Sequence, residues 1–166
     1  LATGKYQIIP RTMYGAVRST GLDASKTMYD EKTQERLGVY LVFDKRPKLG
    51  AYLLGKKGAT LKEAGQQAAL EWASLPVQYT YAKTGCTRGY SAYCKGGANA
   101  TEPLSTTPEF VTELLERTRD YIVDAASWDP IIAELVTGKK PKATAVATAA
   151  AAAEAEPVSS TAPVDE

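Results

Sequence analysis

Apolar side chains recur every three to four positions through most of the sequence before residue 138, and this spacing predicts a mainly α-helical domain. Only the short segment 79–81 has a composition that suits a strand. The protein is therefore expected to consist of short helices joined by loops. The helices predicted from the pattern cover residues 10–20, 30–46, 49–54, 60–75, 107–122 and 130–137.

Residues that favour helix ends stand at the limits of these segments. Asp30 and Thr60 precede two of them, where a side-chain oxygen can accept a hydrogen bond from a first-turn amide. Thr60-Leu61-Lys62-Glu63 has the pattern of a capping box, in which the Thr60 hydroxyl and the Glu63 carboxylate each bind a backbone N–H. Pro10 suits a first helical turn, and Pro76 is expected to end the helix that Thr60 starts.

The stretch 77–106 has no helical period and is rich in Gly, Tyr, Ser and Thr. A loop of this length inside a compact domain is typically functional or mobile. It holds the two cysteines of the chain, Cys86 and Cys94. A disulfide between them would stabilise the fold by about 2–3 kcal/mol, and two free thiols are the alternative, depending on the compartment.

The composition changes abruptly after residue 141, where Ala, Thr, Val, Ser and Glu dominate. Such a segment buries too little apolar surface to fold alone and is typical of a linker. The expected organisation is one domain, residues 1–138, followed by an Ala/Thr/Pro-rich tail or linker, residues 139–166.

Charge and hydropathy narrow the choice of partners. The chain has 20 Lys+Arg against 19 Asp+Glu, so no long-range field favours nucleic acid. No apolar run approaches the roughly 18–20 residues that a membrane span needs. A soluble protein that does not bind nucleic acid and has no membrane span is the expectation.

The residue inventory excludes several kinds of chemistry. With 0 His in the chain, no Ser-His-Asp or Cys-His site can form, and two cysteines alone cannot build a zinc site. No phosphate-binding or dinucleotide motif is present, so neither a cofactor nor a metal is expected. Glycoside cleavage fits what remains, because a carboxylic acid can protonate the leaving oxygen while Tyr and Trp rings lie against the sugar.

Three short motifs stand out by their order and spacing. They are Gly4-Lys5-Tyr6-Gln7, then Trp72-Ala73-Ser74-Leu75-Pro76, then the Gly/Tyr-rich run that includes Ser91-Ala92-Tyr93 and residues 96–100. Together they resemble the lambda-phage endolysin family of peptidoglycan-cleaving, lysozyme-like domains. The resemblance covers residues 2–126, and it implies a lysozyme-like helical domain with a long Gly/Tyr-rich loop and an Ala-rich C-terminal tail.

The resemblance also implies roles for particular residues. Tyr6 and Gln7 would line the floor of a cleft, with the glutamine amide bonded to the sugar, and Trp72 would pack behind it. Tyr93 and Asn99 would contact glycan from a rim loop. The alternatives are that Tyr6 packs in the core, that Gln7 caps a turn, and that the rim is a glycine-rich turn held by its own hydrogen bonds.

The catalytic acid is the main departure from the family pattern. Family members carry it as a glutamate on a helix that precedes the Gly-x-Tyr-Gln turn, so it is expected before Leu1. Inside the chain Glu71 is a weak candidate, for which a solvent-facing helix position is the favoured interpretation. Glu63 is explained by its capping role, and Glu102 and Glu109 by the start of a helix, where a carboxylate meets the helix dipole.

The resemblance implies an enzyme that cleaves the MurNAc–GlcNAc β-1,4 bond of peptidoglycan glycan strands, as a phage or prophage lytic transglycosylase or a virion-associated lysin. The expected location is the phage virion or the bacterial periplasm and cell wall, with the tail available to other virion proteins. One alternative is a non-catalytic structural or glycan-binding virion component that retains the fold. Another is a helical interaction domain whose aromatic loop binds protein.

Overall fold

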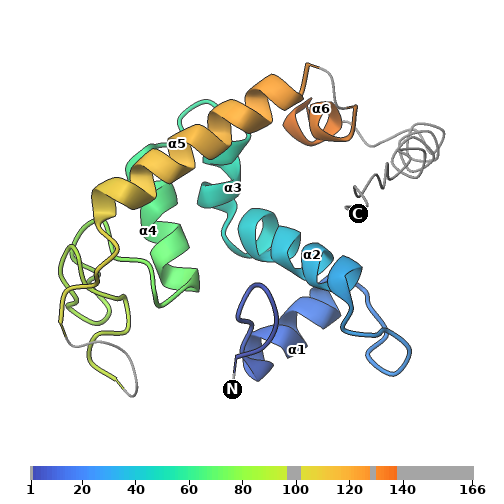
Figure 1. Ribbon diagram of the computed structural model, residues 1–166, viewed down its shortest axis with the longest axis horizontal. Helices are drawn as coiled ribbons and strands as arrows, with labels where there is room; N and C mark the ends of the chain where they lie inside the picture. Colours follow the sequence, from blue (N-terminus) through green and yellow to red (C-terminus); the bar gives the residue numbers. More distant parts are fainter. Residues whose placement is uncertain (1, 97–101, 128–129, 138–166) are drawn as a thin grey trace, which may run out of the picture. The chain divides into compact units, whose positions relative to one another are not determined.

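The computed structural model describes residues 2–96, 102–127 and 130–137. These residues are mainly α-helical, which confirms the predicted fold class at that level (Figure 1). Within them, β structure is limited to the isolated bridges Thr3–Ile8, Pro76–Ser91 and Tyr81–Cys86. The helical elements are α1 (Pro10–Ser19), α2 (Glu31–Val39), the π-helical segment η1 (Tyr40–Lys45), α3 (Pro47–Leu53), α4 (Leu61–Glu71), α5 (Pro108–Ala125) and α6 (Pro130–Thr137).

The chain divides into two units after Tyr121. The first, Leu1–Tyr121, holds α1 to α4 and most of α5, and the second, Ile122–Glu166, holds the end of α5 and α6. The domain boundary predicted after residue 138 and the Ala-rich tail, residues 139–166, lie outside the described residues.

The predicted helix starts are confirmed by their hydrogen bonds. The Asp30 carboxylate accepts from the Thr33 amide at 2.8 Å, and the Thr60 hydroxyl accepts from the Glu63 amide at 3.3 Å. The Glu63 half of the capping box differs from the prediction, because this carboxylate binds the Lys48 ammonium and the Thr60 hydroxyl. Each cap satisfies one of the backbone donors that a helix start leaves open.

The helix predicted over 30–46 is interrupted near its end. At Tyr40 the α-helix changes to the π-helical segment η1, and Arg46 leaves the helical region with φ −119° and ψ 64°. The ring of Pro47 disfavours the α conformation at the residue before it. The chain therefore changes direction between η1 and α3 (Figure 1), and Lys45 and Arg46 lie at this bend.

The helix predicted over 60–75 ends earlier than expected, at Glu71. Trp72 is extended, with φ −112° and ψ 113°, so the prediction that Pro76 ends this helix is wrong. The reason lies outside the segment. Side chains of Arg46 and Tyr93 each donate a hydrogen bond of 2.6 Å to the Leu70 carbonyl, which occupies an acceptor that another helical turn would use.

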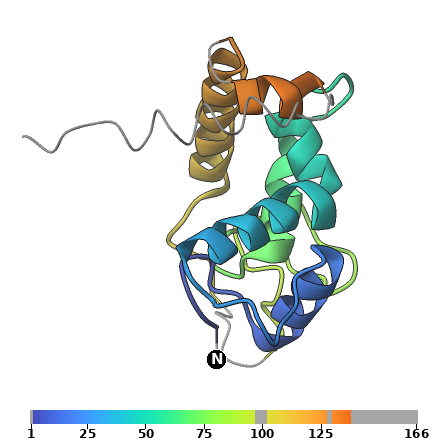
Figure 2. The same ribbon diagram turned by 90° about the vertical axis from the view of Figure 1, so that its right-hand side faces the viewer.

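One apolar core lies under α1 and α2, which are side by side in both ribbon views (Figures 1 and 2). Ile8, Ala16, Leu37 and Leu41 are almost fully buried there. A second core of small and β-branched residues lies between α4 and the loop that follows it, and consists of Ala69, Val77 and Ala92.

The described part of the loop 77–106 contains no helix, as predicted. Of the two alternatives for its cysteines the structure contains the disulfide, which joins Cys86 to Cys94 with 5.9 Å between the Cα atoms. Backbone hydrogen bonds of 2.8 Å from Val77 to Tyr90 and of 2.9 Å from Leu104 to Gly89 hold the rest of the loop.

Replacing Gly38 on α2 by alanine tests how tightly the N-terminal segment packs on the helix. A Cβ at Gly38 would lie 2.6 Å from the Tyr6 ring, so we expect a loss of about 1–3 kcal/mol in the free energy of unfolding. The matched control is Gly15→Ala on α1, where a Cβ meets nothing within 4 Å and better helix propensity adds about 0.5–1 kcal/mol. Urea denaturation measures both, and stabilisation by both substitutions would contradict the packing.

Candidate functional site

The first motif forms a tight hairpin at the start of the chain. Thr3 and Ile8 exchange backbone hydrogen bonds of 3.1 and 3.0 Å, and the turn between them has Gly4 at φ 69° and Gln7 at φ 49°. A positive φ is unusual for glutamine and costs on the order of 1–2 kcal/mol. The Gln7 amide group offsets part of this cost by donating to the Gly4 carbonyl at 2.9 Å, so Gln7 does cap its own turn.

Glu35 on α2 holds the hairpin in place. Its two carboxylate oxygens accept from the Lys5 ammonium and the Tyr6 hydroxyl, each at 2.5 Å. The hydrogen bond from Lys5, followed by that from Tyr6, lowers the pKa of Glu35 below its ordinary value. Burial, followed by the bond to Glu35, raises the pKa of Tyr6. Sequence reasoning missed Glu35, because nothing in its local pattern reveals partners about 30 positions earlier.

Tyr6 has a structural role in addition to its place in the motif. Its ring packs on the N-terminal core and against Gly38, and its backbone carbonyl accepts from the Trp72 indole at 3.3 Å. The interpretation that Tyr6 packs in the core is therefore correct for the ring. Trp72 likewise packs against this core, and both side chains also line a cleft.

This cleft collects most of the residues that the motifs single out. It has a volume of about 490 Å³ and lies between the hairpin, the bend after η1 and the end of α4. Tyr6, Gln7, Trp72 and Tyr93 all line it, although they are separated by up to 87 positions in the sequence. Asn99, the remaining predicted binding residue, lies outside the described residues.

Tyr93 is brought to the cleft by two constraints. Its hydroxyl donates to the Leu70 carbonyl at 2.6 Å, and the next residue is Cys94 of the disulfide. Its side chain stays about two-fifths exposed, which leaves ring surface open to a ligand. Burial of the remainder raises the pKa of Tyr93 above its ordinary value.

Glu71 also lines the cleft, and its predicted solvent-facing position is wrong. The side chain is only 5% exposed, and its two oxygens accept from Lys45 at 2.7 Å and from Arg46 at 2.8 Å. The helix position was predictable but its surroundings were not, because both cations come from the bend about 25 residues earlier. A general acid must offer a proton toward its substrate, and both Glu71 oxygens face cations instead.

The other internal carboxylates lie away from this cleft. Glu63 and Glu109 pair with Lys48 and Arg88 at the surface, and Glu102 is exposed. Among the residues that the structure describes, no three His, Cys, Asp or Glu side chains come together as a metal site. No helix in the described ranges is long and apolar enough to cross a membrane.

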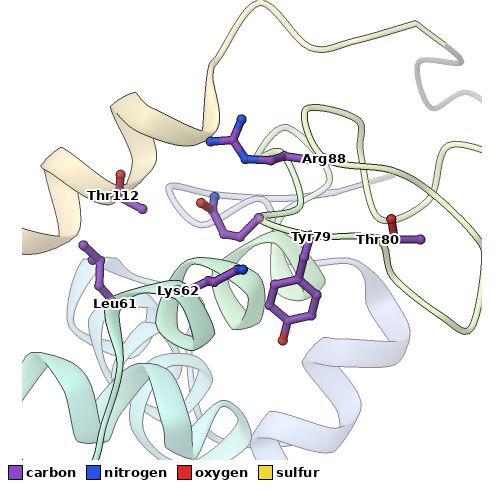
Figure 3. Close-up of a pocket in the computed structure, with 7 residues that line it drawn as sticks. Leu61, Lys62, Tyr79, Thr80, Arg88 and Thr112 are labelled. Carbon is purple, nitrogen blue, oxygen red and sulfur yellow. The ribbon is translucent and has the colours of Figure 1, made fainter.

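A larger cavity of about 600 Å³ lies between the start of α4, the loop after it and α5 (Figure 3). Lys62, Tyr79 and Arg88 line it, and none of the predicted site residues does. Its cations already have partners, because Lys62 lies 5.5 Å from the centre of the Tyr79 ring and Arg88 pairs with Glu109. The volume of a cavity alone therefore does not identify a functional site. The smaller cleft is lined by residues that the motifs single out, and the larger cavity is not.

Lowering the pH tests whether the Glu35 carboxylate anchors the N-terminal hairpin through Lys5 and Tyr6. Because the folded-state pKa of Glu35 is depressed, its contribution to stability is present above the unfolded-state pKa and is lost as the pH falls through the folded-state value. The stability difference between wild type and Glu35→Gln should therefore shrink between about pH 5 and pH 3. Urea unfolding across this range measures it, with the exposed α5 residue Glu116→Gln as control. A difference that stays constant with pH would argue against the anchor.

Glu71→Gln tests the ion-pair cluster in the cleft. We expect a loss of about 1–3 kcal/mol in the free energy of unfolding, because two partly buried cations lose their counter-charge. Glu63→Gln removes a more exposed ion pair with Lys48 and should cost clearly less, because solvent screens that pair. Chemical denaturation compares the two variants. Equal losses in the free energy of unfolding would show that burial of the Glu71 ion pairs does not add to stability.

The cleft offers aromatic ring faces, amide and hydroxyl groups, and two cations within one concave surface. Such a set suits a ligand that combines apolar ring faces with many hydroxyl groups, as a saccharide does. Comparison of the chain with protein-family models, with curated proteins and with solved structures finds no match.

Proposed function

We propose that this cleft binds the glycan strands of peptidoglycan, and that the chain is part of a lysozyme-like domain that cleaves the MurNAc–GlcNAc β-1,4 bond. One observation carries the proposal. Tyr6, Gln7 and Tyr93, which the motifs single out as glycan contacts, line the same cleft although they come from opposite ends of the first hundred residues. A phage virion or the bacterial periplasm and cell wall is the corresponding place of action.

Each of these groups has a suitable part in binding a sugar chain. The exposed surface of the Tyr93 ring can lie against a pyranose, because C–H groups on a sugar face pack well on an aromatic ring. The Gln7 side chain is exposed and keeps its amide oxygen available to a sugar hydroxyl or N-acetyl group. Tyr6 lines the cleft with Gln7, and the Tyr6 hydroxyl is held by Glu35.

Cleavage requires a proton donor, and Glu71 is poorly arranged for that role. Under the proposal the acid is the glutamate that the resemblance places before the Gly4-Lys5-Tyr6-Gln7 turn. In the lytic transglycosylase form of the reaction, this acid protonates the leaving oxygen. It then takes the proton from the sugar's own 6-hydroxyl, whose oxygen attacks C1 and leaves a 1,6-anhydro end. The cleft described here binds and orients the strand.

A non-catalytic role in glycan binding is the second candidate. It is favoured by the pairing of Glu71 with Lys45 and Arg46, because Glu71 is the one carboxylate that lines the described part of the cleft. In that case the domain attaches a larger particle to the cell wall, and the cleft keeps its ligand without cutting it.

Binding of the full chain to purified peptidoglycan sacculi tests the shared part of both candidates. Tyr93→Ala should weaken binding roughly 5- to 30-fold, which corresponds to about 1–2 kcal/mol for an aromatic contact. Tyr14→Ala is the matched control, because Tyr14 is 68% exposed on α1 and does not line the cleft. Co-sedimentation measures the affinities, and equal affinities for the two variants would place binding elsewhere.

Mass spectrometry of the digested sacculi distinguishes the candidates. Products with 1,6-anhydro ends are expected for the transglycosylase, whereas hydrated reducing ends would contradict that form of the reaction and leave a lysozyme. Binding without products supports the non-catalytic role. No binding to sacculi would contradict the proposed function as a whole.

A further inference from the structure

The Lys45–Arg46–Glu71 cluster leaves the cleft with one uncompensated positive charge. Two cations face a single carboxylate, and all three side chains line the cleft. No other acidic residue lines it within the described ranges. A ligand that enters this cleft therefore meets a local positive field, although the whole chain is nearly neutral.

The two cations differ in their hydrogen-bond partners and in how far their side chains are exposed to a ligand. Arg46 donates from Nε to Glu71 and from a terminal nitrogen to the Leu70 carbonyl, and its side chain is only 20% exposed, so its main role is to hold the end of α4. The Lys45 ammonium has three protons, and among the described residues its partner is Glu71 alone. Its side chain is 31% exposed, so the remaining protons can reach a ligand.

Glu71 also fixes Lys45 before any ligand arrives. A free lysine side chain loses considerable rotamer entropy when it is ordered, and this loss normally weakens its contribution to binding. Here the side chain of Lys45 is already ordered by an ion pair of 2.7 Å with Glu71, whose side chain is 5% exposed. A ligand carboxylate would add the attraction between opposite charges to the hydrogen bond from the Lys45 ammonium, whereas a neutral hydroxyl would accept the hydrogen bond alone.

We infer that Lys45 selects ligands that carry carboxylate groups, so that the cleft distinguishes peptidoglycan strands from neutral N-acetylglucosamine polymers. The inference rests on the proposed function and adds the chemical basis of its specificity. The carboxylate can come from the lactyl group of a sugar without a peptide, or from the peptide stem of a substituted sugar. Both present the same chemistry to Lys45, and they are separable by experiment.

The test uses matched pairs of soluble glycan strands with the full wild-type chain. One pair consists of strands freed of stem peptides, with lactyl carboxylates either intact or converted to methylamides. The other consists of strands with stem peptides, with stem carboxylates either intact or amidated. Isothermal titration calorimetry should show roughly 10-fold tighter binding of the carboxylate form in one pair, which identifies the source. Raised ionic strength should reduce this ratio.

Lys45→Met should remove most of the 10-fold ratio while binding to the amidated strands persists. Lys48→Met is the matched control, because Lys48 also pairs with a glutamate but does not line the cleft, and it should leave the ratio unchanged. Circular dichroism checks the fold of both variants. The comparison of matched glycan strands with the wild-type chain does not depend on either variant.

The outcomes separate the inference from the proposed function. Equal affinities of wild type for both members of each pair would overturn the inference and leave glycan binding in place. An equal loss of the ratio in Lys45→Met and Lys48→Met would also overturn it. No binding to any strand would overturn the inference together with the proposed function.

Discussion

The end of α4 is the point on which the cleft depends. Its Leu70 carbonyl accepts hydrogen bonds from Arg46 and Tyr93, and the next residue, Glu71, holds both Lys45 and Arg46. The last carbonyls of a helix need partners, and here side chains from two other parts of the chain provide them. The same few bonds therefore end the helix, fix the bend after η1 and place a tyrosine at the cleft.

The opposite wall of the cleft is fixed by a different device. The hairpin is too short to be stable alone, and its turn contains a glutamine in a left-handed conformation. Glu35 and Trp72 compensate by binding the Lys5 and Tyr6 side chains and the Tyr6 carbonyl. Backbone strain that is maintained by surrounding contacts is common at functional sites, and here it lies at Gln7 itself.

Much of the fold could be predicted from the sequence because it depends on local signals. The caps at Asp30 and Thr60 involve residues only three positions apart, and both were predictable. The early end of α4 and the burial of Glu71 depend on Arg46 and Tyr93, more than twenty positions away in the chain. Neither hydrophobic periodicity nor helix propensity reveals contacts between residues so far apart in the sequence.

The candidate site was predictable in a similar, partial way. The motifs selected Tyr6, Gln7 and Tyr93, and these residues share a cleft. They gave no indication of Lys45, whose place at a π-helical bend follows from packing. Glu35 was missed for the same reason, since its partners lie in a hairpin about 30 residues earlier.

The bond between the Trp72 indole and the Tyr6 carbonyl spans 66 positions of sequence, whereas the helices that flank the cleft form from contacts within a few residues. Contacts of such long sequence separation are slow to form because the entropy of closing a large loop opposes them. The cleft thus depends on a contact that the helices do not need for their own backbone hydrogen bonds. A ligand that binds this cleft in the folded chain alone would therefore stabilise the long-range contact as well as the helices around it.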